Sequence, residues 1–294
     1  MEKGQVPYNA GVMAVRTPVA AGTFYPAHPG QLTRELETCL GTTREGLGPA
    51  PGPLATAVGL ILPHAGYRYS GPVAALGYRT LWALGRPQAV IILGTNHTGL
   101  GGPISFAGPG EWATPLGPLP VHEELTRALA AATGAERSDT PFREEHSVEV
   151  QLPFLQYLFG PIPIVPAVVR ELSPEFCREV GQAMAGVVGR TPVALIASTD
   201  FSHYEPDQVA REKDRRALAH ILNLDLEGFL EAVLRHRISI CGVGTIGILI
   251  SAARTLGLLG AELLAYRTSG EVVGMLDQVV GYAAVMFREV EEVA

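Results

Sequence analysis

The stretch Ala89-Val90-Ile91-Ile92-Leu93-Gly94-Thr95-Asn96-His97 decides the fold class of this 294-residue chain. A short apolar run followed by a polar cluster with glycine is typical of a buried strand that ends in a ligand-binding loop. Three further runs share this character, at 55–62, 162–168 and 193–197. Because these runs are continuously apolar, we expect both faces of their sheet to be covered.

Helical patterns lie between the apolar runs and predict a sheet with helices on both faces. The predicted helices cover 29–41, 73–84, 122–133, 147–159, 174–188, 207–222, 226–236 and 245–258. Two late strands are predicted at 261–268 and 278–287. No long linker or internal repeat interrupts this order. The prediction is therefore an α/β chain with a flexible leader at 1–15 and one domain at 16–294, built on a mostly parallel or mixed central sheet.

Composition and charge exclude several classes of partner. Hydrophobic residues make up 47% of the chain and charged residues 17%, which is typical of a globular protein with a large core. The net charge of −7 and the lack of a basic run argue against a nucleic-acid partner. No apolar stretch approaches the roughly 20 residues of a membrane span. Three cysteines do not make a secreted disulfide framework, and no signal-peptide pattern opens the chain, so we expect a cytoplasmic location.

Two histidines follow predicted strands in matching positions. His64 leaves the first strand in Pro63-His64-Ala65-Gly66-Tyr67, and His97 leaves the second. Either histidine alone equally suits a hydrogen bond inside its own loop, but the repeated placement favours a shared functional site. Asn96 is expected to orient His97 or to bind a substrate oxygen, and Tyr67 is expected to hold a substrate.

A third cluster, Ser198-Thr199-Asp200-Phe201-Ser202-His203-Tyr204, follows the run at 193–197. Asp200 and His203 are three residues apart, so a helical turn here places them on one face. A carboxylate beside an imidazole raises its basicity, which suits a catalytic acid–base pair. The alternative is that Asp200 or Ser202 caps a helix.

Cys241 stands directly before the helix predicted at 245–258. A helix N-terminus lowers the pKa of a thiol, so Cys241 is a candidate thiolate, with an inert core thiol as the alternative. The following Gly242-Val243-Gly244 lacks the Gly-Lys-[Ser/Thr] ending of a phosphate loop, and no nucleotide cofactor is expected. His146 precedes the helix predicted at 147–159 and is expected to line the same pocket as a further catalytic residue.

Six motifs together resemble the Memo family, whose bacterial and archaeal branch is often called AmmeMemoRadiSam system protein B. The motifs are Ala20-Ala21-Gly22-Thr23-Phe24-Tyr25-Pro26, Pro63-His64-Ala65-Gly66-Tyr67, Gly94-Thr95-Asn96-His97, Glu145-His146-Ser147-Val148-Glu149-Val150-Gln151-Leu152-Pro153, Ser198-Thr199-Asp200-Phe201-Ser202-His203-Tyr204 and Cys241-Gly242. They run in order from about residue 16 to the C-terminal part of the chain. The specificity lies in the ordered set, which spans nearly the whole chain.

The resemblance implies a fold similar to LigB-type class III extradiol dioxygenases and a metal site of two histidines and one cysteine. Carried over, the ligands are His64, His97 and Cys241, with Asp200 and His203 beside them and His146 nearby. It implies iron or copper as the cofactor. A thiolate in place of the carboxylate of a ring-cleaving site also suits zinc and makes extradiol cleavage doubtful.

Three functions remain open from the sequence. The first is a redox enzyme with oxygenase-like chemistry on a small molecule. The second is a non-catalytic peptide- or protein-binding module that works with the radical-SAM and AMMECR-type partners implied by the family name. The third is metal-free chemistry with Cys241 as the nucleophile and a histidine as its base.

Overall fold

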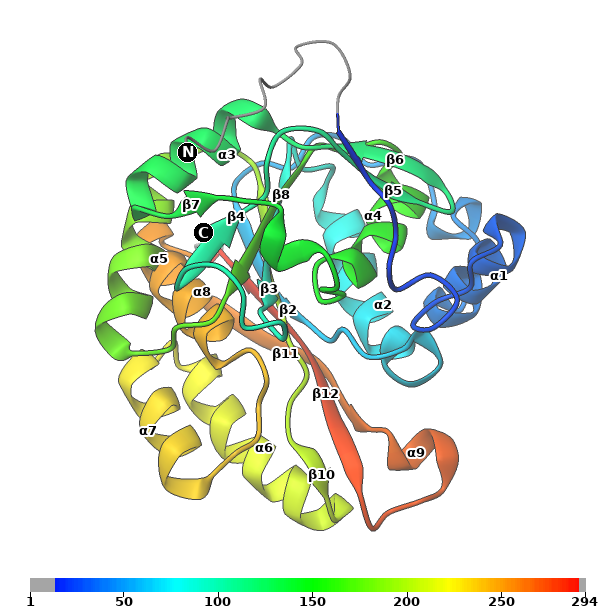
Figure 1. Ribbon diagram of the computed structural model, residues 1–294. Coiled ribbons are helices and arrows are strands. Elements are labelled where there is room, and N and C mark those ends of the chain that lie inside the picture. The colour runs from blue at the N-terminus through cyan, green and yellow to red at the C-terminus, as the bar shows by residue number, and fades with distance from the viewer. Residues whose placement is uncertain (1–13, 291–294) are drawn as a thin grey trace, which may run out of the picture.

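The computed structural model describes residues 14–290, and within them one large mixed sheet forms the centre of the molecule (Figure 1). Nine strands of the described chain join in the order β10-β12-β2-β9-β3-β8-β4-β7, with β11 added beside β12. The strands are β2 (Val58–Leu62), β3 (Val90–Thr95), β4 (Ile104–Phe106), β7 (Glu136–Arg137), β8 (Ile164–Val169), β9 (Ala194–Ser198), β10 (His203–Glu205), β11 (Gly260–Thr268) and β12 (Val279–Arg288).

The four predicted apolar runs form the parallel centre of this sheet. β2 pairs with β9, β9 with β3 and β3 with β8, all parallel. β12 joins β2 and β4 joins β8 in antiparallel fashion. The sheet is therefore mixed with a parallel centre, as the continuous apolar runs predicted.

Helices cover both faces of the sheet, which confirms the predicted α/β architecture (Figure 1). The α-helices are α1 (Pro29–Leu40), α2 (Tyr67–Leu84), α3 (Glu123–Thr133), α4 (Leu152–Phe159), α5 (Pro174–Val188), α6 (Asp207–Leu222), α7 (Leu226–His236), α8 (Val243–Leu256) and the short α9 (Gly270–Val273). Short 3₁₀ helices lie at Glu45–Leu47, Thr140–Phe142 and Glu149–Gln151. The helices α1, α2 and α4 share one core, and α3, α5, α6, α7 and α8 share the other.

Strand alternation divides the two cores. In β2, Ile61 faces the core of α5 and α8, whereas Leu60 and Leu62 face the core of α1 and α2. Successive side chains of a strand point to opposite faces, so a strand buried on both sides must be apolar throughout. This requirement explains why the central runs carry no polar residue until they end.

A smaller three-stranded sheet lies beside the large one. It contains β1 (Val15–Arg16), β5 (Glu111–Thr114) and β6 (Gly117–Pro120). β5 and β6 form an antiparallel hairpin that contains Trp112, and β1 runs parallel to β5. Residues 1–13 of the predicted leader lie outside the described residues, while Val15 already belongs to this sheet.

Two predicted helix boundaries were wrong. α2 begins at Tyr67 rather than at residue 73, because the Tyr67 backbone N–H is satisfied by Phe24 O at 2.8 Å and Pro72 is tolerated inside the helix. The helix predicted at 147–159 begins only at Leu152. The 3₁₀ helix Glu149–Gln151 leads into it, and Ser147 N donates to the Glu145 carboxylate just before that turn.

Candidate metal centre

The site lies at one edge of the sheet, where three neighbouring strands end. β2, β9 and β3 are adjacent and parallel, so their carboxyl ends lie together. His64, Asp200 and His97 each stand two residues beyond the end of their strand. Cys241 joins them from the turn before α8, where its backbone N–H donates to Asp200 O at 3.3 Å.

The nitrogen and sulfur atoms of three of these side chains converge. His64 Nε2 lies 3.4 Å from Cys241 Sγ. One ligand atom each from His64, His97 and Cys241 lies within 4.8 Å of the other two. His64 is only 2% exposed, whereas His97 lies at the protein surface. The site therefore has a buried wall and an accessible side.

The hydrogen bonds around Ser198 determine which nitrogen of His64 faces the sulfur. Ser198 Oγ has one proton, which it donates to Ser147 O at 2.6 Å, and it accepts from Gln151 Nε2 at 2.8 Å. His64 Nδ1 lies 3.2 Å from the same oxygen and must therefore donate to it. With Nδ1 committed as a donor, Nε2 is the nitrogen that faces Cys241.

Glu145 orients the His97 ring, as Ser198 orients the ring of His64. Its buried carboxylate accepts from His97 Nδ1 at 2.9 Å and from the His97 backbone N–H at 2.6 Å. Ser147 N adds a third hydrogen bond at 2.9 Å. His97 Nδ1 is thus a donor, and Nε2 is left for the site. A carboxylate behind a histidine is the arrangement that commonly orients metal-binding imidazoles.

The surroundings of Cys241 favour its thiolate form. Asp200 N donates to Sγ at 3.2 Å, and the hydroxyl oxygens of Thr199 and Thr95 lie at 3.5 and 3.8 Å. Burial alone would raise the pKa of Cys241, but the positive charge of His64 and hydrogen bonds from His64 and His97 bring it well below the usual value.

In the metal-free protein, the pKa values of His64 and His97 are raised. Burial disfavours their charged forms, but the Cys241 thiolate outweighs it and raises the pKa of His64 to about 8. Hydrogen bonds to Cys241 and Glu145 raise the pKa of His97 to about 10. The protonated histidines thus balance the charge of the Cys241 thiolate, and a metal ion would take the place of their protons.

This donor set fits a transition-metal ion. Imidazole nitrogen and thiolate sulfur suit zinc, copper and iron, and each histidine here is oriented by a partner behind it. Three protein ligands leave further coordination positions for a small molecule. The site residues therefore match the cofactor class that the resemblance implied, while the identity of the ion stays a prediction.

His146 lies against this centre. Its ring is stacked between Phe24, at a centroid distance of 4.2 Å, and His97, at 4.7 Å. His64 meets it edge-on at 5.2 Å. Burial and the nearby charge of His64 lower the pKa of His146, so the metal-free site holds it neutral. Glu145 Oε1 lies 3.6 Å from His146 Nδ1, and one ligand atom each from His97, Glu145 and His146 forms a second close group.

Asp200 and His203 do not share a helical face, and this expectation was wrong. His203 begins the strand β10, which pairs with β12 through an irregular register. Asp200 Oδ1 instead accepts from the backbone N–H groups of His64, at 2.8 Å, and Ala65, at 3.3 Å. His203 Nδ1 donates to Ser239 O at 2.8 Å. Asp200 therefore supports the loop of His64 rather than the ring of His203.

Tyr67 and Asn96 are engaged within the protein. The Tyr67 hydroxyl donates to Val150 O at 2.6 Å, and the side chain is buried. Asn96 Nδ2 donates to Leu100 O, and its Oδ1 accepts from Thr98 Oγ1 and Gly99 N. Both residues thus shape loops next to the histidines, and contact with a substrate stays a prediction for each.

Sequence reasoning missed three residues that complete the centre: Glu145, Ser198 and Phe24. Glu145 adjoins His146 and Ser198 ends β9, so both stood inside motifs that were singled out for other residues. Phe24 reaches His146 from a loop far away in sequence. No spacing rule connects them, because each acts through a contact made only in the folded chain.

The fold and the site together define an α/β protein with two histidines and a cysteine at the carboxyl edge of the parallel centre of a mixed sheet. A family model described as Memo-like protein matches residues 16–286. The chain therefore belongs to the Memo family.

Individual relatives agree with this assignment over almost their full length. A MEMO1 family protein of Methanopyrus kandleri is 44% identical, covering 93% of this chain and 99% of the relative. One of Pyrobaculum arsenaticum is 43% identical, covering 94% and 100%. An uncharacterized protein of Escherichia coli K12 has a similar fold, with a TM-score of 0.55, 14% identity and coverage of 78% of this chain and 98% of that one.

Among residues 14–290, no helix has both the length and the apolar character needed to span a bilayer.

Proposed function

We propose that this Memo-family protein binds a redox-active metal ion, iron or copper, through His64, His97 and Cys241. The observation that carries the proposal is that both imidazoles commit Nδ1 to a partner behind them, while one ligand atom of each lies within 4.8 Å of the Cys241 sulfur. Zinc suits the same donors. Bound iron or copper would supply one-electron chemistry with a small molecule or oxygen, which gives oxygenase-like chemistry as the proposed activity.

Two further residues supply groups that handle protons in this proposal. His146 is neutral and partly accessible beside His97, so it can accept a hydrogen bond from a bound molecule. His203 donates Nδ1–H to Ser239 O, so Nε2 is the nitrogen proposed to exchange a proton with a bound molecule. Asp200 holds the backbone of His64 and Ala65 and thereby keeps His64 aimed at Cys241.

A specific feature also favours a second function, a non-catalytic binding module that retains the dioxygenase-like cleft implied by the family resemblance. The third donor is a thiolate, and the neighbouring carboxylate of Asp200 is occupied by backbone N–H groups. A ring-cleaving iron site uses two histidines and a carboxylate. In this reading the cleft recognises a peptide or protein, with radical-SAM and AMMECR-type proteins as the candidate partners.

Metal content tests the first proposal directly. We expect protein purified without oxygen to hold iron or copper, or to take up about one ion per chain on loading, and to consume oxygen with a phenol. Cys241→Ser is expected to reduce bound metal to background. Cys39→Ala removes a buried thiol that is not one of the proposed ligands, and it is expected to keep the metal. Wild-type protein that holds no metal and takes none up would rule the proposal out.

Affinity capture from native extract tests the binding module. We expect co-purification of radical-SAM or AMMECR-type proteins, or peptide binding by the metal-free chain. Recovery of the chain alone, with no peptide bound, would count against this function.

A further inference from the structure

We name residues 16–25 the strap. One buried carboxylate, that of Glu149, holds the strap against the segment that carries Glu145 and His146. Glu149 is fully buried, and all four of its hydrogen bonds come from the strap. The donors are Arg16 NH1 at 2.7 Å, Val19 N at 2.9 Å, Ala20 N at 2.8 Å and the Tyr25 hydroxyl at 2.6 Å. A carboxylate satisfied in this way fixes the strap against the segment that carries Glu145 and His146.

Arg16 reaches across that segment. Its Nε and NH2 atoms donate to Phe142 O at 3.1 and 2.8 Å, and NH2 also donates to Glu145 O at 2.9 Å. With NH1 on Glu149, one planar guanidinium therefore holds both ends of residues 142–149. The Glu145 side chain in the middle of this segment holds His97.

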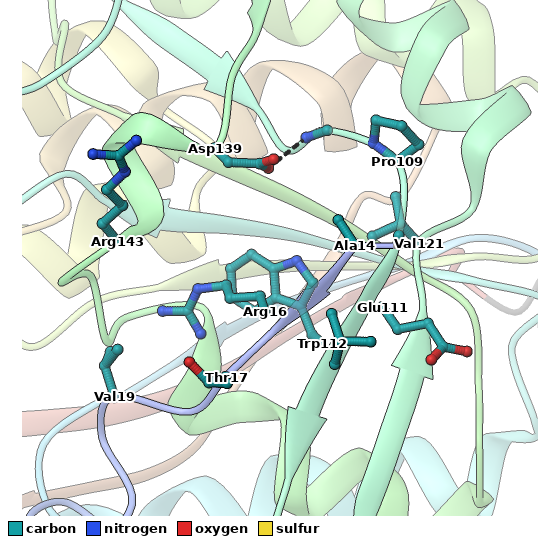
Figure 2. A pocket seen from close by; sticks show the side chains of 13 residues that line it. Ala14, Arg16, Thr17, Val19, Pro109, Glu111, Trp112, Val121, Asp139 and Arg143 are labelled. Atoms are coloured by element: carbon teal, nitrogen blue, oxygen red, sulfur yellow. Dashed lines mark hydrogen bonds between the residues drawn. The ribbon is translucent and has the colours of Figure 1, made fainter. Parts of the chain in front are cut away.

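Trp112 fixes the plane of the guanidinium. The Arg16 Cζ lies 4.1 Å from the centroid of the indole ring, and Figure 2 shows the two side chains side by side. Both line a cavity of about 270 Å³ together with Thr17, Val19 and Arg143. An arginine stacked on an aromatic ring loses little further freedom on forming several hydrogen bonds, so it suits a fixed structural role.

The other end of the strap contacts His146 and the backbone that follows His64. The Phe24 ring stacks on His146, and Phe24 O accepts from Tyr67 N at the start of α2, three residues after His64. The strap thus contacts the segment of Glu145 and His146 and the loop after His64, and it reaches His97 only through Glu145. It contributes no atom to the group of His64, His97 and Cys241.

We propose that Arg16 is a positioning residue of the metal centre, acting through the backbone of Glu145 to set the Glu145–His97 hydrogen bond. The metal part of this inference rests on the proposed function, but the position of His97 in the metal-free protein does not. Partners one layer behind a metal-binding histidine typically change metal affinity by roughly 10- to 100-fold. Arg16 acts one contact further out, so we expect its replacement to weaken binding by about 10-fold.

The test compares Arg16→Lys with Arg211→Lys. Lysine keeps the charge beside Glu149 but cannot donate to Phe142 O and Glu145 O with a planar fork. Arg211 is a matched control, because it also bridges several acceptors (Asp207, Glu271 and Thr268) but at α6, away from the centre. Glu149→Gln is the second test variant, since it keeps the shape of Glu149 and removes its charge.

Two measurements separate positioning from loss of stability. Titration with Zn²⁺ and Co²⁺ gives affinity and the thiolate-to-cobalt absorption, and NMR of the metal-free protein follows the Nδ1–H proton of His97. We expect Arg16→Lys and Glu149→Gln to weaken Zn²⁺ binding about 10-fold, to alter the cobalt spectrum and to broaden or shift the His97 signal. Arg211→Lys is expected to change none of these.

Unchanged metal binding and an unchanged His97 signal in folded Arg16→Lys would overturn the inference, as would an equal effect of Arg211→Lys. If wild-type protein binds no metal, the proposed function fails, and the His97 signal still decides the role of Arg16.

Discussion

Ser198 and Glu145 hold the two histidines of the centre from behind, and neither offers a ligand atom to the group of His64, His97 and Cys241. Ser198 Oγ accepts hydrogen bonds from His64 and Gln151 and donates one to Ser147 O. Because a hydroxyl has a single proton, this network admits only one direction for each bond. The orientation of His64 is thus a consequence of one serine.

Replacement of Ser198 by Ala is expected to weaken metal binding by roughly 10- to 100-fold, because His64 loses the partner that orients it. It also leaves buried polar groups unpaired, which costs about 1–3 kcal/mol of unfolding free energy. Zinc titration and urea unfolding measure the two effects. Ser251→Ala is the control, since it removes a hydrogen bond to Arg178 O far from the centre. Equal zinc affinity in both variants would contradict the role given to Ser198.

The three cysteines are expected to react very differently in the metal-free protein. Burial raises the pKa of Cys39 and of Cys177 to about 12. The pKa of Cys241 instead lies well below its usual value, because His64 and His97 offset the effect of burial. Iodoacetamide near pH 7 is therefore expected to label Cys241 alone, and added zinc is expected to protect it. Peptide mass spectrometry across a pH series checks this, and labelling of Cys241 only above about pH 8.5 would contradict it.

At the scale of elements, the turn into α8 brings Cys241 to the strand ends. Gly242 caps this helix, with its N–H bonded to Thr199 Oγ1 at 2.8 Å. A Cβ added at Gly242 would lie 2.5 Å from Thr199 Cβ and 2.6 Å from Thr245 Oγ1. The turn therefore depends on the absence of a side chain beside the cysteine.

Gly242→Ala is expected to cost about 1–3 kcal/mol of unfolding free energy through overpacking, and to weaken zinc binding by displacing Cys241. Gly186→Ala, at an exposed position of α5 where an added Cβ meets nothing within 4 Å, provides the comparison. It is expected to stabilise the protein by about 0.4–1 kcal/mol. Urea unfolding measures the unfolding free energy of both variants. A Gly242→Ala protein as stable as wild type would contradict the prediction and show that the turn can relax.

At the scale of the whole molecule, the order β2-β9-β3 assembles the centre. Loops that are separated by long stretches of sequence become neighbours because parallel strands end at one edge. The helix α8, packed on α5, adds the cysteine, and the strap adds Arg16 and Phe24. The centre thus joins segments from both ends of the chain, and metal binding is expected to stabilise the fold as a unit.

Zinc at about 100 times its Kd is expected to raise the unfolding free energy by about 2.7 kcal/mol, and the Tm by several degrees. The stabilisation arises because the unfolded chain lacks the converged site. Thermal unfolding with and without zinc measures it, with Cys241→Ser as the control that shows no shift. An equal shift in that variant would place the zinc elsewhere.

The ligand set of His64, His97 and Cys241 was implied by the resemblance of the motifs to the Memo family. The sequence by itself determined the layers, the parallel centre of the sheet and the shared edge of His64 and His97. These follow from local patterns, since apolar periodicity reports burial and strand ends report the binding edge. It did not determine that His203 lies in a strand, that α2 begins at Tyr67 or that Asp200 serves a backbone loop. Backbone hydrogen bonds to distant residues set these features, and no local pattern records them.

Only the tertiary structure decided which nitrogen of each histidine faces the sulfur and which groups hold it there. Ser198, Glu145 and Arg16 act through contacts between residues far apart in the chain. Direction in a hydrogen-bond network depends on every donor and acceptor present, so it emerges only when the segments are packed together. The residue types were present in the sequence, and folding assigned their roles.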